Sequence, residues 1–297
     1  MIRDDACSLQ SAAEPLAGTT PYARAWLILE HPGRWGRDAL TQSGIPEPVV
    51  AHISQAQTQV PLRFLAARRL DQDRRQETPA SRRRVWMAFC DSRGGHTRVT
   101  TIADLSQILD WDLAALAAGV FPTDGELLED PTEFICAHSK RDSCCAVLGR
   151  ERIASVPAEL HEQVWECSHL GGHRFAATSL FLPSGRMYGR LPRYRDDHQH
   201  VAWEPDPRHL RGPSYLPPPL QAAECSVRVS EGLSAAENLD VVELETIGSV
   251  VVVEVTSQSN QRWLVESTPD TFTSAASCGA QALPRTMWRA QILAEGS

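Results

Sequence analysis

Four of the eight cysteines and four of the ten histidines lie within one short stretch of the chain, residues 134–174. This stretch begins with FICAHSKRDSCC and ends with WECSHLGGHR. Thiolate sulfur suits zinc, copper(I) and iron–sulfur clusters, and imidazole suits zinc, iron and copper. A metal site shared by these residues requires the chain to fold so that the two ends of the stretch meet. We therefore predict a metal site with two ligands from each end.

The candidate ligands form two pairs with different spacing. Cys136 and Cys145 lie nine residues apart, whereas His169 and His173 lie four residues apart. Two consecutive glycines separate the histidines, and inside a helix they would cost about 2 kcal/mol relative to alanine. We therefore predict a loop there, because glycine lets the backbone approach a bulky group closely. Adjacent cysteines rarely bind the same metal, so only one of Cys144 and Cys145 is expected to be a ligand.

Length and charge narrow the class of protein. At 297 residues the chain exceeds the usual size of a single domain, so two domains are the first expectation. The net charge of −8 argues against a general nucleic-acid-binding protein. No run of about 18 apolar residues occurs, so no membrane span is predicted. The N-terminus lacks the charged-then-apolar order of a signal peptide. We expect a cytoplasmic protein, in which clustered cysteines bind metals or do redox chemistry more often than they form structural disulfides.

The predicted elements follow the same order twice. The first half has strands at 25–30, 62–66, 85–90 and 98–102, with helices at 38–59 and 105–118. The second half has strands at 133–137, 164–168, 177–182 and 186–191, with helices at 150–163 and 220–233. This order is compatible with an α/β, thioredoxin-like layer of helices on a mixed sheet. We predict a ligand-poor domain at 1–125, a related domain that carries the metal site at 126–235, and a small β appendage at 236–297.

The central motif is specific enough to indicate a resemblance to a known protein family. The pattern C-x-H-x-K-R-D-x-C-C, followed by W-E-C-S-H-L-G-G-H-R-F-A, resembles the sucrase/ferredoxin-like family, and shorter similarities cover most of residues 7–230. The resemblance implies a thioredoxin-like ferredoxin domain with a 2Fe-2S cluster. It implies that the ligands are Cys136, Cys145, His169 and His173. Relatives tend to carry the second cysteine nine residues after the first, which favours Cys145 and leaves Cys144 as the alternate ligand.

A cluster held in this way implies electron transfer, so we expect an electron carrier more than a substrate-transforming enzyme. Two neutral imidazoles in place of two thiolates raise the reduction potential of the cluster. The second nitrogen of each imidazole can take up a proton, so we expect a pH-dependent potential. Lys140, Arg141 and Arg174 could favour the reduced cluster or contact an acidic redox protein, whose identity the sequence does not give. No nucleic acid and no membrane is expected as a partner.

Two alternatives remain open from the residues. The same four side chains could hold a structural zinc ion, for which two cysteines and two histidines are an ordinary ligand set. Cys144 and Cys145 could instead do thiol–disulfide chemistry, although the sequence has no C-x-x-C motif. The remaining cysteines are predicted to pack as small buried apolar residues; they are Cys7, Cys90, Cys167, Cys225 and Cys278. Nothing catalytic is predicted in the C-terminal appendage.

Overall fold

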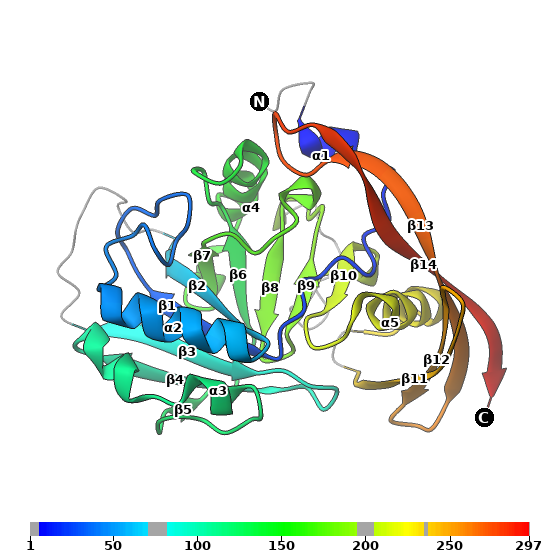
Figure 1. The fold of residues 1–297 in the computed structure, drawn as a ribbon, viewed down its shortest axis with the longest axis horizontal. Coiled ribbons are helices and arrows are strands. Elements are labelled where there is room, and N and C mark those ends of the chain that lie inside the picture. The colour runs from blue at the N-terminus through cyan, green and yellow to red at the C-terminus, as the bar shows by residue number, and fades with distance from the viewer. Residues whose placement is uncertain (1–5, 71–81, 195–204, 235–236, 297) are drawn as a thin grey trace.

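Two β-sheets dominate the protein in a computed structural model that describes residues 6–70, 82–194, 205–234 and 237–296 (Figure 1). A ten-stranded mixed sheet has the strand order β10-β9-β8-β6-β7-β2-β1-β3-β4-β5. A four-stranded antiparallel sheet has the order β11-β12-β13-β14. The α/β prediction is therefore confirmed, whereas a thioredoxin-like fold stays a prediction.

The bounds of these elements are as follows. The large sheet contains β1 (Ala25–Glu30), β2 (Leu62–Arg69), β3 (Arg83–Phe89), β4 (His96–Ile102), β5 (Glu126–Leu127), β6 (Thr132–Cys136), β7 (Val164–Cys167), β8 (Ser179–Leu182), β9 (Arg186–Tyr188) and β10 (Leu210–Pro213). The small sheet contains β11 (Leu239–Ile247), β12 (Val250–Ser257), β13 (Arg262–Ala275) and β14 (Ala282–Gly296). The helical segments are α1 (Cys7–Gln10), α2 (Glu47–Gln59), η1 (Leu105–Asp110), α3 (Leu113–Leu116), η2 (Cys145–Gly149), α4 (Arg150–Ile153), η3 (Ala158–Leu160), η4 (His173–Phe175), η6 (Pro207–His209) and α5 (Pro218–Glu231).

The two halves of the large sheet repeat one pattern. In the first half, β1 is parallel to β2 and antiparallel to β3, which pairs with β4. In the second half, β6 is parallel to β7 and antiparallel to β8, which pairs with β9. The antiparallel pairing of β2 with β7 joins the halves into one sheet. The strands of both predicted domains therefore belong to a single layer, and the predicted boundaries at 125 and 235 stay predictions.

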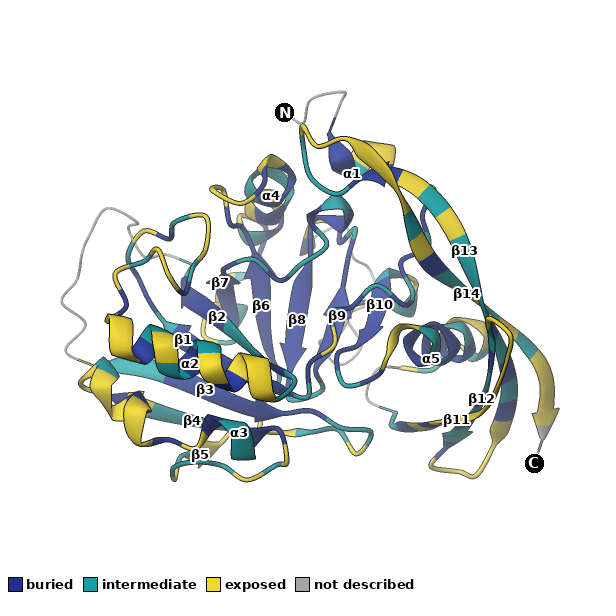
Figure 2. Cartoon of the chain, in the orientation of Figure 1, coloured by how far each residue is buried: buried dark blue, intermediate teal, exposed yellow. Residues whose placement is uncertain are grey.

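The junction between the halves is buried. Figure 2 shows β6, β8 and β9 dark along their lengths, in agreement with the burial of every residue in these strands. Trp86 packs edge-on against Trp165, with ring centroids 4.6 Å apart, and against Phe134 at 5.3 Å. Arg68 on β2 faces its pairing partner Glu166 on β7, with Nη2 2.5 Å from Oε1. Aromatic packing and a buried ion pair thus hold together the strands that lead to the candidate ligands.

Three predicted helices are shorter than their sequence patterns indicate. The helix predicted at 38–59 begins only at Glu47, because Pro46 precedes it and Pro48 occupies its first turn. The stretch 105–118 divides into η1 and α3, each begun by an aspartate whose side chain accepts backbone N–H groups. The stretch 150–163 is helical only in α4 and η3, because Pro157 disfavours helical backbone in the residue before it.

The C-terminal sheet forms a second layer with α5. The apolar side of α5, including Leu220 and Val227, packs on the inner face of this sheet, including Val253 and Trp263. The β structure predicted for the tail is confirmed, and β13 and β14 are its longest strands, with 14 and 15 residues. Figure 1 shows the β13–β14 hairpin reaching back across the molecule to α1 near the N-terminus. The tip of this hairpin therefore lies far from α5 and close to the loop that follows β6.

Candidate metal centre

Parallel pairing of β6 and β7 brings the two ligand pairs to one edge of the large sheet. Cys136 ends β6, and its register partner on β7 is Cys167. His169 follows two residues after Cys167, and His173 begins η4. Cys145 begins η2, the turn that follows the loop after β6. Because parallel strands end at the same edge, residues from both segments meet there, as the sequence analysis predicted.

The four predicted ligands lie together, in an uneven arrangement. Ligand atoms of Cys136, Cys145 and His169 all lie within 4.8 Å of one another. His173 adjoins this group through His169, with its Nδ1 atom 3.3 Å from Nε2 of His169. Two imidazole nitrogens on one tetrahedral metal, each at about 2.0–2.1 Å, are about 3.3–3.4 Å apart. The spacing of the histidines is therefore the spacing that a shared metal requires.

A close approach of backbone segments holds Cys145 beside Cys136. η2 is a π-helical turn, a form of helix that recurs at functional sites. A Cβ atom on Gly149, the last residue of η2, would lie 2.1 Å from the carbonyl oxygen of Cys136. Only glycine lets the turn lie this close to the end of β6.

The histidine loop has a separate support. Gly171 and Gly172 have φ angles of +92° and +74°, so the loop uses backbone that favours glycine. Arg211 on β10 is buried; its Nη1 atom donates to the carbonyl oxygen of Gly171 at 2.9 Å, and its Nη2 atom donates to that of Thr19. The sequence analysis missed Arg211, because no local motif connects it with residues some forty positions earlier.

Burial and hydrogen bonding shift the pKa values of Cys136 and Cys145 in opposite directions. Hydrogen bonding from Cys145, opposed by burial and assisted by His169, holds the pKa of Cys136 well below its ordinary value. Hydrogen bonding to Cys136, together with burial, raises the pKa of Cys145. The pair therefore favours the thiolate at Cys136 and the thiol at Cys145. A metal ion at this place would displace the proton and bind both sulfurs as thiolates.

The imidazoles offer free nitrogens. His169 Nδ1 and His173 Nε2 are buried and have no hydrogen-bond partner among the described residues. Burial, opposed by the charge of Asp142, lowers the pKa of His173. Neutral imidazole is the form that binds metals. Two sulfurs and two imidazoles fit a zinc ion or an iron–sulfur cluster by donor chemistry.

Comparison with known proteins finds a family match that spans all four predicted ligands. The family model described as sucrase/ferredoxin-like matches residues 16–199, which is more than half of the chain. The chain belongs to the sucrase/ferredoxin-like family. A relative is the Candida glabrata protein named "Altered inheritance of mitochondria protein 32", with 31% identity over 109 residues. That alignment covers 35% of this chain and 33% of the relative, so the chain corresponds to about a third of that protein. No solved structure matches.

The sequence analysis predicted no membrane-spanning segment. Within the described ranges of this sucrase/ferredoxin-like protein, no helix combines the length and apolar character needed to cross a membrane. The cytoplasmic location stays a prediction.

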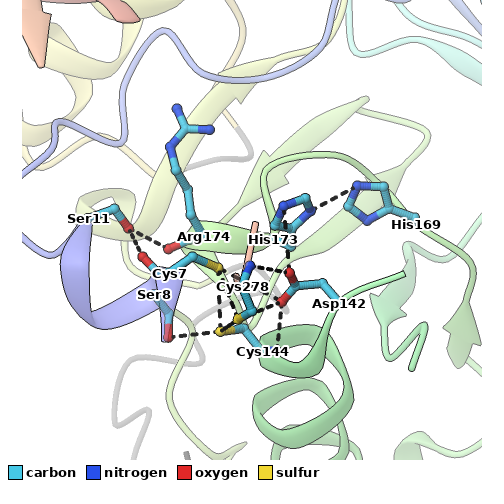
Figure 3. Close-up of polar contacts among 9 residues, drawn as sticks. All are labelled: Cys7, Ser8, Ser11, Asp142, Cys144, His169, His173, Arg174 and Cys278. Carbon is cyan, nitrogen blue, oxygen red and sulfur yellow. Dashed lines mark hydrogen bonds and ion pairs between the residues drawn. The ribbon is translucent and has the colours of Figure 1, made fainter. Parts of the chain in front are cut away.

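Cys144, the predicted alternate ligand, lies in a different group (Figure 3). Its sulfur is 3.3 Å from that of Cys278 and 3.6 Å from that of Cys7. Asp142 completes this second group, in which all ligand atoms lie within 4.8 Å of one another. Hydrogen bonds, the largest from Cys7 and others from Ser8 and Cys278, lower the pKa of Cys144 to about 6. The sulfurs of Cys144 and Cys145 therefore have different neighbours.

Two cysteines that the sequence analysis treated as isolated packing residues belong to this second group. Cys7 lies on α1, and Cys278 lies in the turn between β13 and β14. Cys7 is buried as predicted and Cys278 is half-buried, but both also face Asp142 and Cys144, because α1 and the hairpin tip, remote in sequence, meet beside the cysteine loop. No motif links these positions, and both lie outside the segment 16–199 that the family model matches. The other three, Cys90, Cys167 and Cys225, are buried as predicted.

Proposed function

We propose that this protein is an electron carrier that holds a 2Fe-2S cluster through Cys136, Cys145, His169 and His173. When bound, such a cluster accepts and releases one electron at a time. The observation that carries the proposal is the meeting of two buried sulfurs and two adjoining imidazoles at the common edge of β6 and β7. Membership in the sucrase/ferredoxin-like family supports it.

The uneven arrangement favours two metal atoms over one. A single tetrahedral zinc ion needs all four ligand atoms around one centre, with separations below about 4 Å. His173 does not join Cys136, Cys145 and His169 in the group whose ligand atoms all lie within 4.8 Å. Two irons, one held by the sulfurs and one by the imidazoles, do not require His173 to approach the sulfurs. Structural zinc is therefore the second candidate.

Thiol–disulfide chemistry between Cys144 and Cys145 is the third candidate, and the geometry favours it least. The sulfur of Cys145 is hydrogen-bonded to that of Cys136, whereas Cys144 contacts Cys7 and Cys278. Each sulfur would have to leave its present neighbours before the adjacent pair could form a disulfide. An activity of this kind should survive iron chelation and disappear on alkylation of both cysteines.

The histidines give the proposed carrier two properties. Neutral imidazoles leave less negative charge at the iron than thiolates would, so the reduction potential rises. The outer nitrogen of His173 faces Asp142, with Nε2 3.8 Å from Oδ2. A carboxylate at this distance stabilises a proton on that nitrogen, so uptake of an electron can be accompanied by uptake of a proton.

The surface beside the site is basic. His169 lines a cavity of about 310 Å³ that Arg37 and Arg141 also line. Arg37, Lys140 and Arg141 are exposed, whereas Arg174 is engaged with Glu14 at 2.9 Å. Positive charge beside an electron exit steers negatively charged partners. We propose an acidic redox protein as the partner that docks here.

Anaerobic purification followed by metal and sulfide analysis tests the function. We expect about two iron and two acid-labile sulfide per chain, with the visible absorption of an iron–sulfur protein. Cys136→Ser should abolish both, whereas the matched control Cys225→Ser, at a buried cysteine outside both groups, should keep them. His169→Cys should retain a cluster of lower potential, since a thiolate replaces a neutral ligand. Colourless wild-type protein without iron or sulfide would end the proposal.

A further inference from the structure

Four side chains outside the first site converge from three remote parts of the chain. Cys7 comes from α1, Asp142 and Cys144 from the loop after β6, and Cys278 from the turn between β13 and β14. Figure 3 shows the three sulfurs gathered around one point beside the carboxylate of Asp142. If these loops packed together by chance, there would be no reason for three cysteines and an acidic residue to face one another. The arrangement therefore needs its own explanation.

The distances fit a tetrahedral metal. The three sulfur–sulfur separations are 3.3 Å, 3.6 Å and 3.6 Å. Oδ1 of Asp142 lies 3.4 Å from the sulfur of Cys278 and 3.9 Å from that of Cys7. Sulfurs bound to one zinc ion at about 2.3 Å are about 3.8 Å apart in a tetrahedron. The group is within a few tenths of an ångström of this geometry before any ion is added.

The carboxylate is already fixed in place. Backbone N–H groups donate to it from Cys144, at 2.8 Å to Oδ1, and from Cys278, at 2.9 Å to Oδ2. Asp142, Cys7 and Cys144 are buried, and Cys278 is half-buried. Outer contacts that orient the ligands are typical of metal sites. A cavity of about 440 Å³, which Asp142, Cys144 and Cys278 line, provides a path for an ion.

We propose that Cys7, Cys144, Cys278 and Asp142 bind a zinc ion. Three thiolates and one carboxylate oxygen are a soft, four-coordinate donor set that suits Zn²⁺. When the zinc ion binds, the remaining thiol protons are released into solvent. No group is oxidised or reduced in this step. A disulfide would use two of the sulfurs and leave the third cysteine unexplained, whereas one ion uses all three.

The site explains how α1 and the tip of the β13–β14 hairpin are held in place. α1 has four residues, too few for a helix to be stable by itself. The hairpin tip likewise reaches far from the apolar contact between its sheet and α5. A zinc ion would tie both segments to the loop that precedes Cys145. The C-terminal appendage, in which the sequence analysis predicted nothing catalytic, then has a structural role through this second site.

Metal analysis of the full-length protein tests this inference. Protein purified anaerobically without chelators should contain about one zinc per chain, counted separately from iron. Cys7→Ser and Cys278→Ser should each lower the zinc affinity at least about tenfold and leave the iron content unchanged. Cys225→Ser is the matched control that keeps zinc. Cys136→Ser should lose iron and keep zinc, which separates this site from the first one.

A second measurement does not depend on the folding of variants. Zinc-depleted wild-type protein should take up Co²⁺, develop the absorption of a tetrahedral cobalt thiolate, and lose it when Zn²⁺ is added. Bound Zn²⁺ should also protect Cys278 from alkylation. The inference is overturned if wild-type protein neither contains zinc nor takes up Co²⁺. It is equally overturned if zinc persists in both serine variants, disappears only with Cys136→Ser, or is replaced by a disulfide in the anaerobic protein.

Discussion

Asp142 faces His173 across the space between the two groups of ligands, with Oδ2 3.8 Å from Nε2 (Figure 3). The same carboxylate contacts Cys278 through its other oxygen, at 3.4 Å from the sulfur. One buried acidic side chain therefore belongs to the surroundings of both sites. Its charge acts on the outer nitrogen of His173, where the proposed carrier would hold its proton.

Asp142→Asn should move the pH dependence of the reduction potential to lower pH. Burial lowers the pKa of His173, and the charge of Asp142 opposes that effect. Without the carboxylate, the protonated ring loses a stabilising partner and its pKa falls further. Redox titration over a pH series measures this, with Glu159→Gln as an exposed control. An unchanged pH range would show that Asp142 has no part in the proton transfer.

Gly149→Ala should loosen or abolish the first site. The new Cβ would lie 2.1 Å from the carbonyl oxygen of Cys136, so η2 must move away from β6. Overpacking of this kind costs about 1–3 kcal/mol of unfolding free energy. Denaturant unfolding and iron content measure the two effects. Gly33→Ala is the control, because its Cβ would meet its nearest neighbour, His31 Nε2, at an ordinary 3.5 Å, and it should keep both.

The protein should lose stability in mild acid, in part through His31. Burial first, and the nearby Arg83 guanidinium second, hold the pKa of His31 below its ordinary value of 6.5. The folded state thus favours the neutral ring. Its contribution is complete above that ordinary value and declines as the pH falls through it toward the folded pKa. The slope for one group is at most about 1.4 kcal/mol per pH unit.

Urea unfolding at about pH 8 and about pH 5.5, on either side of the histidine range, measures this loss. His31→Gln should show a shallower decline, since glutamine can keep contacts with Arg83 and with the carbonyl oxygen of Ser43 and does not titrate. Arg83→Gln should also reduce the decline, because it removes a positive charge from beside the ring. Equal declines in all three proteins would contradict the assignment.

Reversing the exposed charges beside His169 should slow electron exchange with anions. The double variant Lys140→Glu and Arg141→Glu should react with ferricyanide about three- to tenfold more slowly at low salt. Added salt should remove most of the difference, because exposed charges are screened. Stopped-flow oxidation of the reduced protein measures the rate. Arg262→Glu, at an exposed position on β13, should leave the rate near that of the wild type.

Local signals predicted the strands well. Strand β1 has the bounds that its apolar run indicates, β6 is shifted by one residue from its prediction, and β7 ends one residue earlier than predicted. Cys136, Cys145 and the two histidines were singled out by the density of such residues and by the family resemblance, and the parallel pairing of β6 and β7 brings them together. Helices were predicted less well, since proline and capping aspartates divided periodic stretches such as 105–118.

The types of candidate ligand, their spacing in two pairs and the order of strands and helices depend on residues close together in the chain. The sequence by itself therefore determined them. The tertiary structure alone decided that Cys144 turns from Cys145 toward Cys7 and Cys278, and that Arg211 supports the histidine loop. Those contacts join residues separated by 134, 137 and 40 positions. No periodicity or motif spans such separations, because they arise when sheets and hairpins pack in three dimensions.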